Sequence, residues 1–185
     1  CPFSCTFCYH AFKVSKYRYY PFTLVLEEFT RLQRAYGIGF LNFWDELTLF
    51  SRHRTIELCD AIEAAGVEVY WPLNPRGNLF SEKDLDLLKR CVSLGAVSIG
   101  GALESYNPEI LRAMNKKMNA SEFIAQMQTA RKAGLTPNTS LVFGYPQETR
   151  ETIRDTLEVC RQAGVFPSAG FVLPLPNTPI YESAR

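Results

Sequence analysis

Five glycines divide the sequence into repeating units, and this repeat restricts the fold more than any other feature. Each follows a segment with helical periodicity and precedes an apolar, strand-like run: Gly37, Gly66, Gly95, Gly134 and Gly164. Glycine just past a helix end adopts the left-handed backbone conformation at no steric cost. A spacing of about thirty residues accommodates one helix, one strand and two short loops. The alternation predicts an α/β fold with a parallel sheet and outer helices, and leaves open whether the sheet closes into a barrel.

The same periodicity assigns a range to each element. We expect helices at residues 23–36, after Ser51, from Ser81, after Ser121 and at 150–163. Ser81 and Asp84 fit a capping box. Strands are expected at residues 38–44, 67–73, 96–100, 139–143 and 170–173, and one or two additional helical turns at 108–114. Because no long linker interrupts this pattern, residues 1–185 are predicted to form a single domain.

The composition is that of a soluble globular domain, since 46% of the 185 residues are hydrophobic and 21% are charged. A formal net charge of +1 provides no general electrostatic footprint for nucleic acid or an anionic membrane. The sequence contains neither an apolar run of membrane-spanning length nor a signal-peptide pattern. Residues 13–22 interleave basic and aromatic side chains, a pattern that also suits RNA. The preferred interpretation is a loop that covers the site, or a docking surface for a missing domain.

Polar residues follow the expected strands, at the edge where parallel α/β folds place their active sites. The candidates at this edge are Asp45, Glu46, Arg76, Glu104, Ser105 and Gly144, with Leu173 ending the last strand. The segment that contains the first three cysteines precedes the first expected helix and opens on the same edge. We therefore expect charged side chains and thiols to share one mouth.

Cys1, Cys5 and Cys8 form a Cys-x-x-x-Cys-x-x-Cys spacing. Thiolates this close can ligate one metal centre, and soft sulfur selects zinc or iron–sulfur. A structural zinc site needs a fourth ligand, for which His10 is the nearest candidate, although it follows Cys8 too tightly to favour closure. The odd number of cysteines within this loop argues against disulfides. The remaining cysteines lie on or near apolar helix faces and are interpreted as small core residues: Cys59, Cys91 and Cys160.

Several motifs in order along the chain resemble those of the radical S-adenosylmethionine (SAM) superfamily. Phe7 stands before the last cysteine, which gives the pattern Cys-x-x-x-Cys-x-aromatic-Cys. Further similarities are found at residues 43–46, 101–105, 143–149 and 176–181. The resemblance implies a partial (β/α)6 TIM-like barrel. Its first strand would lie before Cys1, so the chain is predicted to be cropped from a longer protein and to contain the second to sixth strands.

The resemblance also implies the chemistry and the site. Cys1, Cys5 and Cys8 would hold a 4Fe–4S cluster, and SAM would chelate its fourth iron. One electron would then cleave SAM into methionine and a 5′-deoxyadenosyl radical. The implied SAM contacts are Phe7 and the backbone near Leu173 for the adenine, Asp45 or Glu46 for the ammonium, Arg76 for the carboxylate, Glu104 and Ser105 for the amino acid or ribose part, and Gly144 in the fourth loop.

The pattern Cys8-Tyr9-His10 and the strand ending in Asp45 and Glu46 are most similar to the cobalamin-associated branch of the superfamily. This similarity implies a methyltransferase, or related C–H or C–C chemistry, with cobalamin bound by a domain outside this chain. It also implies a small-molecule or peptide substrate, an external electron donor and a cytoplasmic setting. Two alternatives stay open: a tRNA methylthiotransferase-like or porphyrin-pathway radical SAM enzyme, and a non-enzymatic zinc or iron–sulfur binding module.

Overall fold

The computed structural model describes residues 1–12, 17–45 and 47–185. Its sheet contains β1 (Trp71–Leu73), β2 (Ala96–Gly100), β3 (Thr136–Phe143) and β4 (Phe166–Phe171) in this order. All three pairings are parallel, and the longest register runs from Asn138 opposite Phe166 to Phe143 opposite Phe171. The predicted parallel α/β architecture is therefore confirmed.

The helices begin and end close to where the sequence places them. They are η1 (Tyr9–Phe12), α1 (Phe22–Tyr36), α2 (Arg52–Ala65), η2 (Glu82–Asp84), α3 (Leu85–Ser93), α4 (Pro108–Ala113), α5 (Ala120–Ala133), α6 (Arg150–Ala163) and α7 (Pro179–Ala184). The predicted capping box at Ser81 and Asp84 is present. One start was wrong, because Asn119 rather than Ser121 accepts the hydrogen bond from Glu122 N–H and caps α5.

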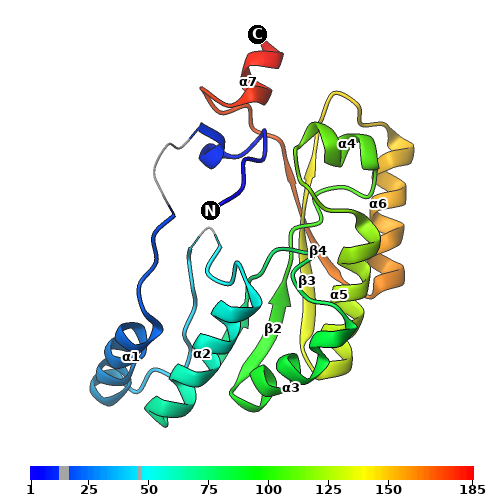
Figure 1. Ribbon diagram of the computed structural model, residues 1–185. Coiled ribbons are helices and arrows are strands. Elements are labelled where there is room, and N and C mark those ends of the chain that lie inside the picture. The colour runs from blue at the N-terminus through cyan, green and yellow to red at the C-terminus, as the bar shows by residue number, and fades with distance from the viewer. Residues whose placement is uncertain (13–16, 46) are drawn as a thin grey trace.

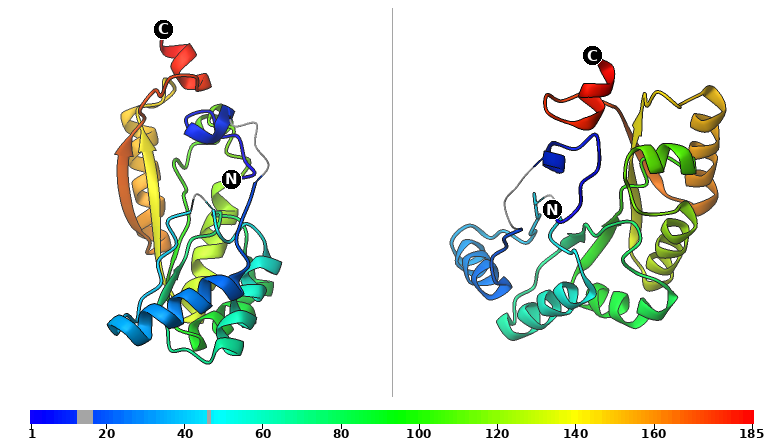
Figure 2. Two further views of the ribbon diagram at one scale, coloured as in Figure 1. Left: turned by 90° about the vertical axis from the view of Figure 1, so that its left-hand side faces the viewer. Right: turned by 45° about the horizontal axis from the view of Figure 1, so that its top comes forward.

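The helices and the cysteine segment lie on opposite sides of the sheet. Helices α3, α5 and α6 cover one side, whereas residues 1–12 lie on the other side, near the carboxyl ends of the strands (Figure 1). The same separation is visible from two further directions (Figure 2). The side of the sheet opposite these three helices, called the inner side below, therefore faces the cysteine segment.

The expected strand at residues 38–44 was wrong in extent. Phe40 forms a single parallel bridge to Tyr70, supported by hydrogen bonds from Leu41 N–H to Tyr70 O and from Tyr70 N–H to Gly39 O. The segment then leaves β1, and among the described residues no strand pairs with its other edge. Two backbone hydrogen bonds align it with the sheet without making it a regular strand.

The ends of two other strands differ from the prediction. The expected strand at 67–73 is reduced to Trp71–Leu73, and the one expected at 170–173 lies earlier, at Phe166–Phe171. Pro167 lies within this earlier strand. Because β4 is an edge strand of the described sheet, it tolerates a proline that cannot donate a hydrogen bond.

All five repeat glycines have positive φ, as predicted. Gly95 has a second reason to be glycine, since a Cβ atom there would lie 1.9 Å from Val69 O. The chain thus turns closely past β1 before entering β2. Beside this turn, the indole N–H of the fully buried Trp71 donates to Leu94 O at 2.9 Å.

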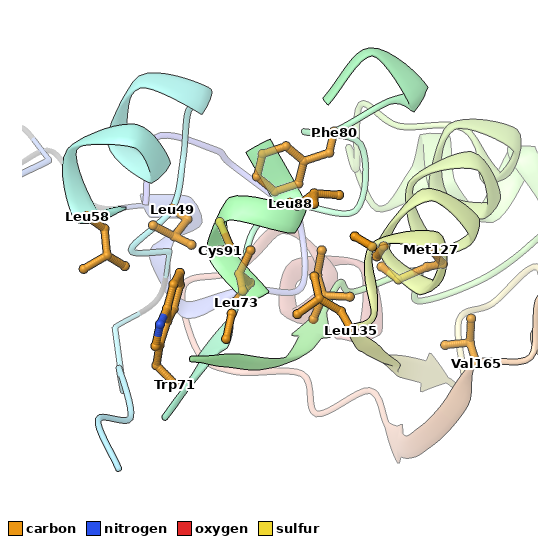
Figure 3. Close-up of a cluster of buried hydrophobic side chains, with 14 of the residues drawn as sticks. Leu49, Leu58, Trp71, Leu73, Phe80, Leu88, Cys91, Met127, Leu135 and Val165 are labelled. Carbon is orange, nitrogen blue, oxygen red and sulfur yellow. The ribbon is translucent and has the colours of Figure 1, made fainter. Parts of the chain in front are cut away.

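The main core lies between the sheet and the outer helices (Figure 3). Its fully buried side chains come from the strands and from the facing helices, and include Leu58, Trp71, Leu73, Leu88, Ile99, Phe123 and Met127. A smaller cluster of Ile110, Met114, Tyr145 and Ile180 lies apart from it and packs against Phe7. Among the described residues, no helix is both long and apolar enough to cross a membrane.

Candidate active site

The three clustered cysteines line one cavity of about 390 Å³. All three thiols are unpaired and partly exposed, whereas Cys59, Cys91 and Cys160 are buried in the core, as expected. The cavity lies at the carboxyl ends of β1 and β2 and against the inner side of β3 and β4, with these residues in its wall: Phe3, Phe7, Leu47, Asn74, Arg76, Gly100, Gly101, Glu104, Lys116, Asn138, Ser140 and Ser168. Of the predicted SAM contacts, Phe7, Arg76 and Glu104 are thus brought together with the thiols.

Alternation along β3 places amide and hydroxyl groups in the cavity wall. Asn138 and Ser140 are exposed on the inner side of β3, while the intervening Thr139 is buried. Ser168 pairs with Ser140 in the register and continues this polar side onto β4. On β2, a Cβ atom at Gly100 would lie 2.8 Å from Asn74 Oδ1 and 3.0 Å from Asn138 Oδ1. Glycine at this position leaves room for two amides at the cavity wall.

Arg76 brings an incompletely paired cation to the cavity. Its guanidinium carbon lies 3.8 Å from the centre of the Phe3 ring, a stacking arrangement typical of arginine. Its Nε and Nη2 atoms are buried and have no hydrogen-bond partner among the described residues. Burial lowers the pKa of Arg76, and the neighbouring Cys5 and Glu104 act in the opposite direction. Two adjacent N–H groups of a fork-shaped guanidinium that lack a partner among the described residues are suited to a carboxylate ligand.

Glu104 brings the opposite charge. Its Oε1 atom accepts from Lys116 Nζ at 2.7 Å, and both side chains are buried. Its Oε2 atom is buried without a hydrogen-bond partner in the described part of the chain. The backbone of Glu104 is bonded to β3 on both sides, to Ser140 O and from Val142 N–H, and has a left-handed φ of 65°. This unusual conformation at a cavity is the kind that functional sites retain.

The segment that carries the cysteines is held mainly through Thr6. Thr6 N–H donates to Met114 O, Thr6 Oγ1 donates to Ala113 O at 2.8 Å, and Thr6 O accepts from Ile180 N–H. Its hydroxyl also lies 2.9 Å from Tyr145 Oη. Burial raises the pKa of Tyr145, and the hydrogen bond to Thr6 opposes this rise. Phe7 meets the Tyr145 ring edge to face at 6.3 Å.

The residues present fit an iron–sulfur cluster together with an amino acid ligand. Within the described ranges, no three His, Cys, Asp or Glu side chains gather as closely as one metal ion requires. A cubane cluster places each thiolate on a different iron and so needs a wider spacing. The donor set of three thiols in one wall is the set that such clusters bind. The unpaired Arg76 and Glu104 atoms are complementary in charge to the carboxylate and the ammonium of an amino acid.

Other predicted contacts lie outside the cavity wall. Asp45 is exposed and accepts from Thr48 Oγ1 at 2.9 Å. Ser105 is buried, and its Oγ atom accepts from Asn107 N–H at the start of α4. Gly144 is exposed and donates its N–H to the Glu148 carboxylate, and Leu173 is 68% exposed. Glu46 lies outside the described residues, as do residues 13–16 of the basic and aromatic segment.

Sequence reasoning missed Thr6, Asn115, Lys116 and the polar side of the sheet. The alternation of Asn138, Thr139 and Ser140 was a usable signal, but the expected strand began one residue too late to include Asn138. Lys116 and Asn115 follow a short helix and carry no local pattern. Their importance depends on partners that are distant in sequence.

The sequence model of the Radical SAM superfamily matches residues 1–160. The chain therefore belongs to the radical SAM superfamily, whose enzymes use a 4Fe–4S cluster and SAM, and the predicted family is confirmed. It is 29% identical to an uncharacterised methyltransferase of Pyrococcus horikoshii, over 100% of this chain and 40% of the relative. It is 27% identical to the anaerobic magnesium-protoporphyrin IX monomethyl ester cyclase of Cereibacter sphaeroides, over 100% of this chain and 31% of that protein.

Solved structures share the fold at lower identity. TsrM, a radical SAM methyltransferase from Kitasatospora setae with cobalamin and a 4Fe–4S cluster bound, superposes with a TM-score of 0.79 at 21% identity, over 97% of this chain and 34% of TsrM. The coproporphyrinogen III oxidase HemN from Escherichia coli gives a TM-score of 0.70 at 18% identity, over 95% of this chain and 43% of HemN. The chain spans 31% to 41% of the curated relatives that it matches over its full length.

Proposed function

We propose that this chain is the catalytic core of a cobalamin-associated radical SAM enzyme, acting in methyl transfer or related C–H or C–C chemistry. The observation that carries the proposal is the convergence of three thiols, the unpaired Arg76 donors and the unpaired Glu104 oxygen on one cavity. When bound, the cluster supplies the one-electron reduction of SAM. The cobalamin-associated branch is supported by the relatives and by the likeness to TsrM.

Each group of residues around the cavity has a separate role in this proposal. Cys1, Cys5 and Cys8 hold three irons as thiolates. Arg76 orients the carboxylate of SAM, and Glu104 Oε2 accepts a hydrogen bond from its ammonium or ribose. Asn74, Asn138, Ser140 and Ser168 supply amides and hydroxyls for the remaining polar groups, and Phe7 covers the adenine. The contacts of Asp45, Glu46, Ser105, Gly144 and Leu173 with SAM stay predictions.

The setting and partners follow from the same chemistry. A partly exposed cluster is sensitive to oxygen, which supports a reducing, cytoplasmic compartment. An external donor supplies the electron, and the substrate is a small molecule or a peptide. Cobalamin is bound by a domain outside this chain.

Anaerobic reconstitution tests the metal assignment. We expect about four irons and four sulfides per chain, and Cys5→Ala to lose them. Cys160→Ala is the matched control, because it removes a thiol buried on α6 without touching the cavity. One bound zinc in place of iron would support the binding-module alternative and overturn the enzyme proposal.

SAM turnover tests the reaction class. With a strong reductant, the reconstituted protein should release 5′-deoxyadenosine or transfer the SAM methyl group, and Arg76→Met should weaken SAM binding. A reconstituted protein with an intact cluster but no SAM binding would contradict the proposal. Likeness to the cyclase of Cereibacter sphaeroides makes porphyrin chemistry the second candidate, and a panel of tetrapyrrole substrates distinguishes the two.

A further inference from the structure

The turn after α4 contacts the cysteine segment through four hydrogen bonds. Two come from Thr6, whose N–H donates to Met114 O at 3.0 Å and whose Oγ1 donates to Ala113 O at 2.8 Å. The other two come from Asn115, whose Nδ2 donates to Ser4 O at 2.8 Å and to Ser4 Oγ at 3.1 Å. Residues 113–116, called the α4 turn below, therefore dock the chain between Cys1 and Cys5 and between Cys5 and Cys8.

The next residue of the same turn reaches the opposite part of the site. Lys116 Nζ lies 2.7 Å from Glu104 Oε1, and the two side chains are 7% and 6% exposed. Because Oε1 is occupied by Lys116, the unpaired Oε2 atom is the one left for a ligand. Lys116 N–H donates to Leu111 O at 2.9 Å, which ties the ion pair to the last turn of α4.

The backbone of the α4 turn separates these two contacts. Asn115 has a φ of 51° and Lys117 a φ of 47°, a conformation that non-glycine residues seldom adopt. In a regular helix, consecutive side chains are rotated by about 100° around the helix axis, so neighbouring residues contact adjoining surfaces. Here the left-handed residues redirect the chain, so that Asn115 meets the cysteine segment while Lys116 enters the buried side of the cavity.

We propose that the α4 turn is a clamp that fixes the cysteine segment and the Glu104 carboxylate relative to each other, with Asn115 and Lys116 as its positioning residues. The inference rests on the proposed function, because it assigns the thiols to the cluster and Glu104 to SAM. Neither positioning residue takes part in the chemistry. Chelation of the fourth iron by SAM would already couple the two halves of the site. The clamp adds to this coupling, because it holds the thiols and the Glu104 carboxylate in a fixed relative position.

Two variants test the two contacts of the α4 turn separately, one at the cysteine segment and one at Glu104. Asn115→Gly removes the amide and suits the left-handed backbone, so it tests the contact with Ser4 without adding strain. Its matched control is Asn177→Gly, since Asn177 also has a left-handed φ of 68° and is exposed. Lys116→Met combined with Glu104→Gln removes both charges and leaves no uncompensated buried ion. Its control is Lys117→Met at the adjacent exposed lysine.

The readouts are the rate at which a chelator extracts iron from the anaerobically reconstituted protein, and the equilibrium affinity for SAM. Asn115→Gly should speed extraction about tenfold, because two hydrogen bonds to the cysteine segment are lost. The Lys116→Met/Glu104→Gln variant should weaken SAM binding about tenfold and keep the wild-type extraction rate without SAM. At SAM concentrations that saturate each variant, SAM should still protect the cluster less than it does in the wild type.

A purely structural role would not affect this protection. The change that SAM causes in the electron paramagnetic resonance spectrum of the reduced cluster should likewise be altered in both variants and unchanged in Asn177→Gly and Lys117→Met. Wild-type protection by SAM in both variants overturns the clamp. Failure of the wild type to hold a cluster or SAM instead overturns the proposed function, so the two failures are distinguishable.

Discussion

Lys116 Nζ lies 2.7 Å from Glu104 Oε1, in a pair that is almost entirely removed from solvent. Burying two charges is costly, and removing one partner leaves the other without compensation. We expect Lys116→Met to lower the free energy of unfolding by about 3–5 kcal/mol.

Urea unfolding of the cluster-free protein measures this cost. Glu104→Gln in the Lys116→Met background should recover most of the loss, and Lys117→Met should cost little. A Lys116→Met protein as stable as the wild type would show that the pair is not buried.

The turn before β2 should not tolerate a side chain at Gly95. An alanine Cβ would lie 1.9 Å from Val69 O at a φ of 87°, so both the backbone conformation and the space oppose it. We expect Gly95→Ala to cost about 3 kcal/mol or more in thermal or urea unfolding. Gly37→Ala is the control, since it has a similar positive φ and no neighbouring atom within 4 Å. It should cost only about 1 kcal/mol.

Asp84 should make stability depend on acid pH. It accepts from Arg52 Nε at 2.5 Å, Arg52 Nη2 at 2.7 Å and Ser81 N–H at 2.7 Å. The Arg52 guanidinium, followed by the Ser81 hydrogen bonds, holds the pKa of Asp84 below its ordinary value. The folded state therefore binds this proton less readily than the unfolded state does. Its stabilisation is complete above the unfolded pKa of about 4 and is lost as the pH falls through the folded pKa.

Asp84→Asn keeps an acceptor but loses the charge, and should cost about 2 kcal/mol at neutral pH. Its stability should also fall less steeply below about pH 4. Glu28→Gln is the control, because Glu28 and its partner Arg31 are both more than half exposed. It should change neither the stability at neutral pH nor its dependence on acid. Equal acid dependence of Asp84→Asn and the wild type would contradict the assignment.

The six cysteines should react in two groups. Cys1, Cys5 and Cys8 are partly exposed, whereas Cys59 and Cys91 are fully buried with sulfur atoms 3.6 Å apart. The contact between the two thiols raises the pKa of Cys91 and lowers that of Cys59, so the protection of Cys59 rests on its complete burial. Burial raises the pKa of Cys160. Because the thiolate is the reactive form, iodoacetamide should first modify the cavity cysteines of the cluster-free protein. Mass spectrometry should find the helix cysteines modified only after unfolding.

The sequence predicted helices better than strands. Helix ends such as the one at Gly164 depend on local spacing and a cap, and both are visible in the chain itself. Strand extent depends on pairing. Residues 38–44 stop bonding to Tyr70, just before β1, after Leu41. Pro167 lies within β4, which is paired at only one edge. Neither outcome is encoded in the residues of the strand alone.

Site residues could be predicted from the sequence where the side chain is chemically distinctive and its position is marked by a motif or by the end of a strand. Three cysteines, Arg76 and Glu104 were predicted to share one mouth from spacing and from their positions after strands, and they line one cavity. Their contacts with a ligand stay predictions. Asn115 was not, because its partner Ser4 is 111 positions away and an asparagine after a helix is usually interpreted as a cap. Lys116 was missed for the same reason, since only the folded chain shows that it is buried.

Thr6 is bonded to the main-chain atoms of Ala113, Met114 and Ile180, and this has a consequence for how such proteins diverge. Any amino acid that preserves the backbone path can occupy these three positions as far as the bonds to Thr6 are concerned. Substitutions can therefore accumulate around the cysteine segment while its location is inherited unchanged. Distant relatives of this chain should be able to change these three side chains, within the limits set by packing around Phe7, and still present their thiols at the same place.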